Sequence, residues 1–242
     1  MKKKNTKMML QKRIAALLAI FALVFSDMHG VVYAAEDSWE EVQLDDISGI
    51  ENTTELNNLL AERGSAIRKK RLDDRGFALT NIKRLLQNDS QWKDVVIGTR
   101  ENGTKITMGE SGCTITSFTI VSNWLSNTSI TPVDVKNRMG SNACPFAWTV
   151  AESLYGYDLA IKEMNDNGIA SGTDTILGAI DLYETPVIVG VKNAATTHFV
   201  VAYGYTSSYD IIISDPAQRN YTTLSQYLNE GYYIHRIFLY LK

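Results

Sequence analysis

The chain has 242 residues, of which 45% are hydrophobic and 21% charged, and its formal net charge is −3. This composition is typical of one globular domain with a hydrophobic core and an appendage, without internal repeats or low-complexity tracts. The acidic balance argues against a nucleic-acid-binding protein, because neutralising phosphates requires a basic face.

The first 35 residues have the pattern of a secretory signal peptide. A basic stretch at 2–13 precedes an apolar run at 14–25, which is short for a membrane span. Val32-Tyr33-Ala34, followed by another alanine, is a small-residue cleavage site. The alternative is an uncleaved membrane anchor, which the polar residues and glycine at 27–30 disfavour. We therefore expect residues 1–35 to be removed and the protein to be secreted, extracellular or at the cell surface.

Cleavage of this segment changes the charge of the product. It takes away six basic residues and one acidic residue, which leaves 18 basic and 26 acidic residues and a net charge of −8. No other segment is long and apolar enough to span a membrane. We expect neither nucleic acid nor, after cleavage, a membrane among its partners.

Residues 36–86 are rich in charged and amide side chains, unlike the rest of the chain. The spacing of leucine and isoleucine predicts a helix over 54–71 and a second, short amphipathic helix over 79–86. We interpret this stretch as a small helical N-terminal region and a candidate removable pro-segment. Its basic run, Arg68-Lys69-Lys70-Arg71, is either a solvated helix end or a protease-sensitive activation site.

The main domain is predicted to span residues 87–242 and to change from helices to strands along its length. Turn residues at 94–108 predict a loop or a small hairpin. Apolar spacing, capping residues and closing glycines predict helices at 113–125, from 131 onward, and at 148–155, 173–183 and 223–230. Runs of β-branched and aromatic residues predict strands at 186–191, 198–205, 210–216 and 232–241. Short links between strands favour antiparallel pairing, so the expected fold class is α+β.

Cys113 lies between a glycine-containing turn and the apolar helix predicted behind it. A thiol at a helix N-terminus is exposed to the positive end of the helix dipole, which stabilises a thiolate. The backbone N–H groups there can also bind the oxyanion of a tetrahedral intermediate. Gly109 and Gly112 allow the backbone to turn sharply and to approach a substrate closely. Cys113 is therefore a candidate nucleophile, although a buried structural cysteine would fit the local sequence equally well.

The second cysteine, Cys144, provides the competing interpretation. Two cysteines in an exported protein are also the pattern of a single disulfide, here between Cys113 and Cys144. Such a bond would remove the thiolate.

A thiolate nucleophile requires a base, and only two histidines remain after signal cleavage. His198 stands at the start of a predicted strand, where its side chain can face a cleft. His235 lies inside the last strand, where we expect it on the solvent face or with its hydrogen bonds satisfied in the sheet. Asp215 ends the strand after that of His198, and pairing of these two strands through the turn at 206–209 would bring the carboxylate to the imidazole.

Several motifs then occur in a specific order. They are Gln87-x-Asp89-x-x-Trp92, Gly109-x-Ser111-Gly112-Cys113-x-x-Thr116-Ser117, Ile130-Thr131-Pro132, Pro186-Val187-Ile188-Val189, His198-Phe199-Val200-Val201 and Asp215-Pro216. With them, the chain from Gln87 to its end resembles the C39-like peptidases. These are relatives of the bacteriocin-leader (double-glycine) peptidases within the papain-like cysteine peptidase superfamily.

The resemblance implies a papain-like fold and a role for each matched residue. Cys113 would be the nucleophile, His198 the general base and acid, and Asp215 the residue that orients the imidazole. Gln87 would match the oxyanion-hole glutamine, with Gln91 as a nearby alternative. The family often has glycine after the cysteine, whereas this chain has Thr114.

Together these features predict a secreted cysteine peptidase that hydrolyses peptide bonds in a peptide or protein substrate. Two alternatives remain, a hydrolase of peptidoglycan cross-bridges and a catalytically inactive papain-like binding or adhesion module. The histidines and cysteines lack metal-ligand spacing, and no phosphate-binding glycine loop occurs, so we expect neither a metal nor a cofactor.

Overall fold

The computed structural model describes residues 53–69, 76–217, 219 and 221–242. The predicted signal peptide and the first part of the N-terminal region lie outside these residues, as do Lys70 and Arg71 of the basic run. Among the described residues, no helix combines the length and the apolar character needed to cross a membrane.

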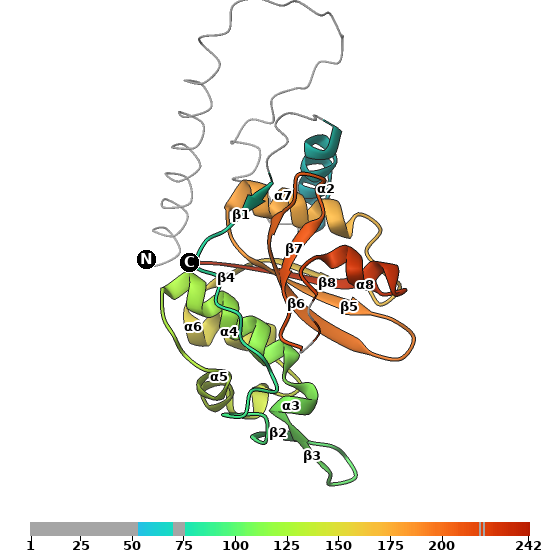
Figure 1. The fold of residues 1–242 in the computed structure, drawn as a ribbon. Helices are drawn as coiled ribbons and strands as arrows, with labels where there is room; N and C mark the ends of the chain where they lie inside the picture. The colour runs from blue at the N-terminus through green and yellow to red at the C-terminus, as the bar shows by residue number, and fades with distance from the viewer. Residues whose placement is uncertain (1–52, 70–75, 218, 220) are drawn as a thin grey trace, which may run out of the picture. The chain divides into compact units, whose positions relative to one another are not determined.

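An antiparallel sheet of six strands forms the centre of the described chain (Figure 1). Its order is β1-β6-β5-β8-β4, and β7 pairs with β6. The strands are β1 (Phe77–Ala78), β4 (Asp158–Met164), β5 (Val187–Lys192), β6 (Thr197–Tyr205), β7 (Ile211–Ser214) and β8 (Tyr233–Leu241). The first five residues of β5 are all buried. Such a continuous apolar run indicates a strand that is covered on both faces.

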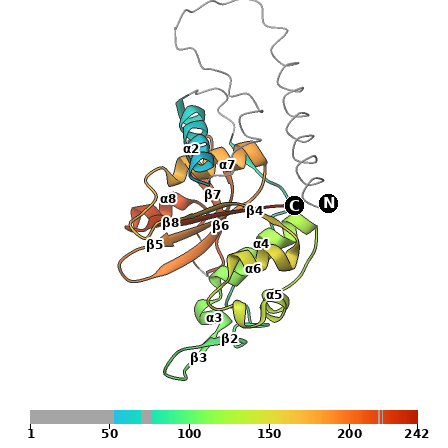
Figure 2. The same cartoon turned by 180° about the vertical axis from the view of Figure 1, so that it is seen from behind.

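Helices cover the two faces of this sheet (Figures 1 and 2). On one face lie α4 (Cys113–Ser126) and α6 (Trp148–Tyr155), with α5 (Pro132–Met139) beyond them. On the other face lies α7 (Gly172–Tyr183), with α2 (Thr53–Lys69) packed against it. The smaller elements are β2 (Val96–Thr99), β3 (Lys105–Thr107), α3 (Met108–Ser111), a 3-10 turn (Gly140–Asn142) and α8 (Leu224–Asn229). The expected α+β class is confirmed, with the Cys113 helix packed on an antiparallel sheet.

The core on the α4 face is largely aromatic. Phe118 of α4 is fully buried and contacts four other aromatic rings, among them Tyr240 of β8 at 5.3 Å between ring centroids. The ring of Trp148 stacks on Phe238 at 3.7 Å. These contacts connect the helix that carries Cys113 to the sheet, so the position of the thiol depends on the core rather than on a loop.

Two glycines explain how α2 approaches α7 so closely. A Cβ atom on Gly64 would lie 1.9 Å from the carbonyl oxygen of Asp174, and one on Gly178 would lie 2.1 Å from that of Leu60. Ion pairs between Arg63 and Asp181 and between Arg68 and Asp174 flank this contact. Arg68, in the predicted basic run, is therefore engaged by α7.

The helix predicted over 79–86 is wrong, because this segment is extended. Asn81 has a φ of 63°, which a helix does not accommodate. Leu79 N–H donates to the carbonyl of Tyr203, and the indole of Trp124 donates to that of Thr80. The apolar side chains of Ile82 and Leu85 pack against the core cluster from this extended segment. The amphipathic spacing therefore reflects tertiary packing rather than helical periodicity.

Candidate active site

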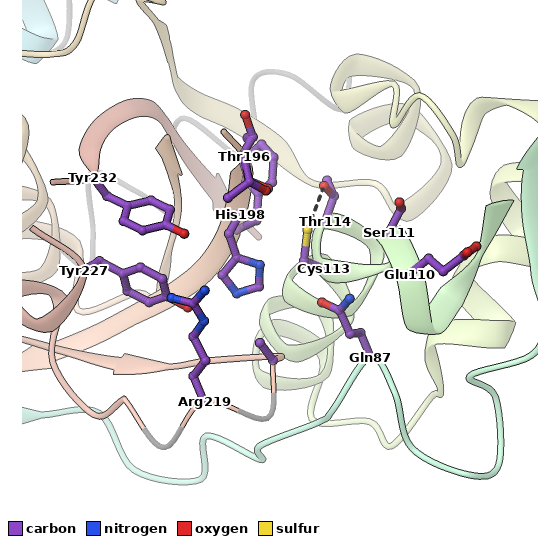
Figure 3. A pocket seen from close by; sticks show the side chains of 13 residues that line it. Gln87, Glu110, Ser111, Cys113, Thr114, Thr196, His198, Arg219, Tyr227 and Tyr232 are labelled. Atoms are coloured by element: carbon purple, nitrogen blue, oxygen red, sulfur yellow. Dashed lines mark hydrogen bonds between the residues drawn. The ribbon is translucent and has the colours of Figure 1, made fainter. Parts of the chain in front are cut away.

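A cavity of about 470 Å³ opens where the N-terminus of α4 meets the end of the sheet (Figure 3). Gln87, Cys113 and His198 line it. Asp215 lies behind His198 with its side chain fully buried. The structure thus brings together all four residues that the sequence analysis predicted for the catalytic site.

Cys113 is the first residue of α4, and a short helix holds the turn before it. In α3, Thr107 and Glu110 form a capping box. Gly112 follows, and a Cβ atom there would lie 2.4 Å from the carbonyl oxygen of Met108, so only glycine fits. The N–H groups of the first turn of a helix have no acceptor within that helix. One turn further along, the hydroxyl of Ser117 donates to the carbonyl of Phe199 at 3.1 Å, which fixes α4 against the strand of His198.

Strand pairing brings His198 to Asp215. β6 and β7 are antiparallel, with Val201 opposite Ser214, and this confirms the pairing predicted through the turn at 206–209. Nε2 of His198 lies 2.7 Å from Oδ1 of Asp215. Since Asp215 engages Nε2, Nδ1 is the ring nitrogen left to interact with the thiol.

Asp215 receives further hydrogen bonds that the sequence did not suggest. The hydroxyl of Tyr227, in α8, donates to Oδ2 at 2.7 Å, and the N–H of Ala217 donates to Oδ1 at 2.8 Å. The ring of Tyr227 also lies 5.7 Å from that of His198. A buried carboxylate needs such donors to remain charged. Tyr227 thus helps to hold both the carboxylate and the imidazole.

A second unforeseen residue, Arg84, holds the loop that follows Asp215. Its guanidinium donates to the carbonyls of Asp215, Ala217 and Arg219 at 3.2–3.3 Å. Arg84 comes from the extended segment just before Gln87. Nothing in its local sequence distinguishes it from other surface arginines, so only the tertiary contacts reveal this role.

The thiol and the imidazole change each other's protonation. Burial by itself would raise the pKa of Cys113, but the hydrogen bond and positive charge of His198, with a backbone hydrogen bond from Phe199, lower it below its usual value. Burial would likewise lower the pKa of His198, yet hydrogen bonds and charges from Asp215 and Cys113 raise it to about 9. Both shifts favour a thiolate–imidazolium pair.

Gln87, rather than Gln91, faces the cavity. Nε2 of Gln87 donates one hydrogen bond to the carbonyl of Gly109 at 2.9 Å, and its second N–H remains for another acceptor. The backbone N–H of Gln87 donates to the carbonyl of Pro216, next to Asp215. Gln91 is exposed and does not line the cavity.

Comparison with known proteins agrees with this geometry. The model of the Peptidase C39 like family matches residues 80–236, which include Gln87, Cys113, His198 and Asp215. The chain belongs to the C39-like peptidase family. No curated protein and no solved structure gives a significant match. Membership points to a cysteine peptidase, and the helix-on-sheet arrangement is the α+β, papain-like fold of such enzymes.

The remaining candidate residues of this C39-like chain lie elsewhere. Cys144 and Cys113 are both free thiols, so the expected sign of an inactive module, a disulfide between them, is absent. Cys144 packs against Gly98 of β2.

His235 is neither on the solvent face nor satisfied in the sheet. It is 4% exposed, and its ring nitrogens have no hydrogen-bond partner among the described residues. That expectation was wrong, because β8 lies between two other strands and is covered.

Two predictions about the site stay open. Among the described residues, no cluster of three or more histidine, cysteine or acidic side chains could hold a metal ion. None of the described residues within 53–86 lines the cavity, and α2 instead buries Leu60 completely. Whether the N-terminal region is a removable pro-segment stays a prediction, and its removal would also take away α2, β1 and Arg84.

Proposed function

We propose that this protein is a secreted cysteine peptidase that hydrolyses peptide bonds through the thiolate of Cys113. The observation that carries the proposal is the position of His198. Its Nε2 is engaged by buried Asp215 at 2.7 Å, while its ring faces Cys113 in the same cavity (Figure 3). Nucleophile, base and orienting carboxylate are the arrangement that thiol hydrolysis requires.

In the acylation step, the Cys113 thiolate attacks the carbonyl carbon of the scissile bond. The oxyanion that forms accepts hydrogen bonds from the N–H of Cys113 and from the second N–H of Gln87 Nε2. When the intermediate collapses, the C–N bond breaks and protonated His198 gives its Nδ1 proton to the leaving amine. The product is a thioester between Cys113 and the acyl part of the substrate.

In the deacylation step, His198 accepts a proton from a water molecule that attacks the thioester carbonyl. The second tetrahedral intermediate expels Cys113 as a thiolate and releases a carboxylic acid. The proton stays on His198, so the starting ion pair is restored. Asp215 keeps Nε2 protonated throughout, which directs Nδ1 to the reacting atoms.

Export rests on the sequence of the first 35 residues. Their basic stretch, apolar run and small-residue cleavage site support a cleaved signal peptide. Expression in a secreting host followed by N-terminal sequencing of the product in the medium tests this. A mature N-terminus near residue 35 would support export, whereas a full-length protein retained in the cell would contradict it.

The two cysteines provide a matched test of the chemistry. Cys113→Ala and Cys144→Ala each remove one partly buried thiol, and their cleavage of a peptide library can be followed by mass spectrometry. We expect Cys113→Ala to lose activity by about 10³-fold or more, because it removes the nucleophile, while Cys144→Ala keeps it.

Equal cleavage by wild type and Cys113→Ala would contradict the proposal. Purified cell walls form a second arm of the assay. Cys113-dependent release of amino groups from walls, without cleavage of any peptide, would instead support the peptidoglycan alternative.

A further inference from the structure

An arginine, Arg219, lines the cavity beside the catalytic pair. Among the described lining residues, the charged side chains other than Cys113 and His198 are Glu110 and Arg219. Oε2 of Glu110 is used by the α3 capping box, where it accepts from the N–H and the hydroxyl of Thr107. Arg219 lies on the His198 side of the cavity, next to Tyr227 and Tyr232 (Figure 3). The two charges therefore lie on opposite sides of the catalytic pair.

Arg219 is held at both its backbone and its side chain. Nη2 of Arg84 donates to its carbonyl oxygen at 3.2 Å. Its guanidinium carbon lies 5.7 Å from the ring centroids of Tyr221 and Tyr227 and 5.9 Å from that of Tyr232. Three aromatic faces around a guanidinium attract its charge and restrict its rotamers. Because the Arg219 side chain is already restricted, ordering it on ligand binding costs less conformational entropy than ordering a free surface arginine would.

The guanidinium already pairs with one carboxylate of the chain. Nη1 of Arg219 lies 3.1 Å from Oε2 of Glu230, and the hydroxyl of Tyr221 donates to the other oxygen of the same carboxylate. The Arg219 and Glu230 side chains are 44% and 47% exposed. An ion pair this exposed contributes little stability, so a carboxylate arriving in the cavity can replace or share it.

We propose that Arg219, framed by its three tyrosines, is a carboxylate-binding subsite that selects peptide substrates with an acidic group near the scissile bond. The proposal rests on the peptidase function described above. Within a peptide, the anion that a guanidinium recognises is a carboxylate, either an Asp or Glu side chain or a free C-terminus. Because the exported chain is acidic overall, it repels acidic peptides at long range, and a local cation is needed to bind them.

A peptide library with Glu and Gln at equal frequency in each position tests the subsite. Cleavage products are read by mass spectrometry for wild type, Arg219→Gln, Glu230→Gln and Arg63→Gln. Arg63 is an exposed, ion-paired arginine of α2 outside the cavity, so its variant controls for the loss of one positive charge.

We expect wild type and Arg63→Gln to enrich Glu over Gln about tenfold at one position flanking the cleaved bond. Arg219→Gln should reduce this ratio to about one, and Glu230→Gln should raise it, because the competing carboxylate is gone. A duplicate library with amidated C-termini distinguishes the two sources of the carboxylate. If the Glu/Gln ratio persists in the amidated library, the subsite binds an acidic side chain. If peptides with free C-termini are preferred over amidated ones, it binds the C-terminal carboxylate.

Two results would overturn the subsite. In the first, wild type cleaves peptides in a Cys113-dependent way but prefers neither acidic residues nor free C-termini. This result would contradict the subsite and leave the peptidase function intact. A preference that survives in Arg219→Gln assigns carboxylate recognition to other residues. If no Cys113-dependent cleavage occurs at all, both the peptidase function and the subsite are contradicted.

Discussion

The two histidines in the described chain are buried to a similar degree, but their pKa values shift in opposite directions. The side chain of His198 is 14% exposed and that of His235 is 5% exposed. His198 meets Asp215 at 2.7 Å, whereas the carboxylate nearest to His235 is Asp166, at 3.7 Å from Nδ1. Asp166 is itself bound by Arg236 at 2.8 Å. One imidazole therefore has a dedicated carboxylate, and the other only the edge of an existing ion pair.

Their pKa values follow from this difference. Burial lowers both, but Asp215 and the Cys113 thiolate raise the pKa of His198 to about 9. For His235, burial and the charge of Arg236 lower the pKa to about 4. The two cysteines differ in the same way, since burial raises the pKa of Cys144 while His198 reverses that effect at Cys113. Reactivity here depends on a paired partner and not on burial alone.

The largest contrast is expected from replacing each histidine. His198→Ala should lower kcat/KM by about 10³-fold or more, because it removes both the proton carrier and the stabilising charge on the thiolate. His235→Leu should leave kcat/KM unchanged and should not lower Tm, since it removes buried nitrogens that have no hydrogen-bond partner. Steady-state kinetics and thermal unfolding of the two variants check this. A large loss of activity in a folded His235→Leu variant would show that both histidines are needed for activity and would contradict this prediction.

Asp215→Asn addresses the partner itself. We expect kcat/KM to fall about 100-fold, because the amide orients the imidazole less well. In wild type, activity should fall as the pH rises through about 9, where His198 loses its proton. Without the Asp215 carboxylate, His198 loses one of the two partners that raise its pKa against the effect of burial, so this alkaline limit should move to lower pH. A pH–rate profile measures the shift. An unchanged alkaline limit would mean that Asp215 does not set the protonation of His198.

The cysteines can be compared in a single sample of wild-type protein. Iodoacetamide reacts with thiolates, so Cys113 should be alkylated about tenfold or more faster than Cys144 near neutral pH. Mass spectrometry of the digested protein over a time course gives both rates. The same alkylation time course on the His198→Ala variant provides the control, because Cys113 should no longer react faster than Cys144 there. Equal rates in wild type would argue against the ion pair.

The smallest effect is expected at Tyr227, which acts through Asp215. Tyr227→Phe keeps the ring beside His198 and removes one hydrogen bond, so kcat/KM should fall about fivefold. KM should change little, and the alkaline limit of the pH profile should shift measurably. A purely structural role would lower Tm without moving that limit. A wild-type pH profile with lowered stability would therefore contradict a positioning role.

Much of the nucleophile side of the site could be predicted from local sequence. The glycine turn, the apolar helix behind Cys113 and the capping at Thr131-Pro132 depend on neighbouring residues, whose hydrogen bonds and side-chain periods form locally. The pairing of His198 with Asp215 was also predictable, since one short turn joins their strands. Scarcity of histidine made His198 almost the sole candidate for the base.

Only the tertiary structure decided what surrounds that pair. Tyr227, Arg84 and Arg219 are positioned by contacts with residues far from them in the sequence or in other elements, and their local sequences do not predict these contacts. The same holds for residues 79–86, whose helical spacing was overridden by packing, and for His235, whose burial depends on the strands on both sides. Amino-acid order determines local conformation and apolar period, whereas the partners of a buried charge depend on which distant elements the core brings together.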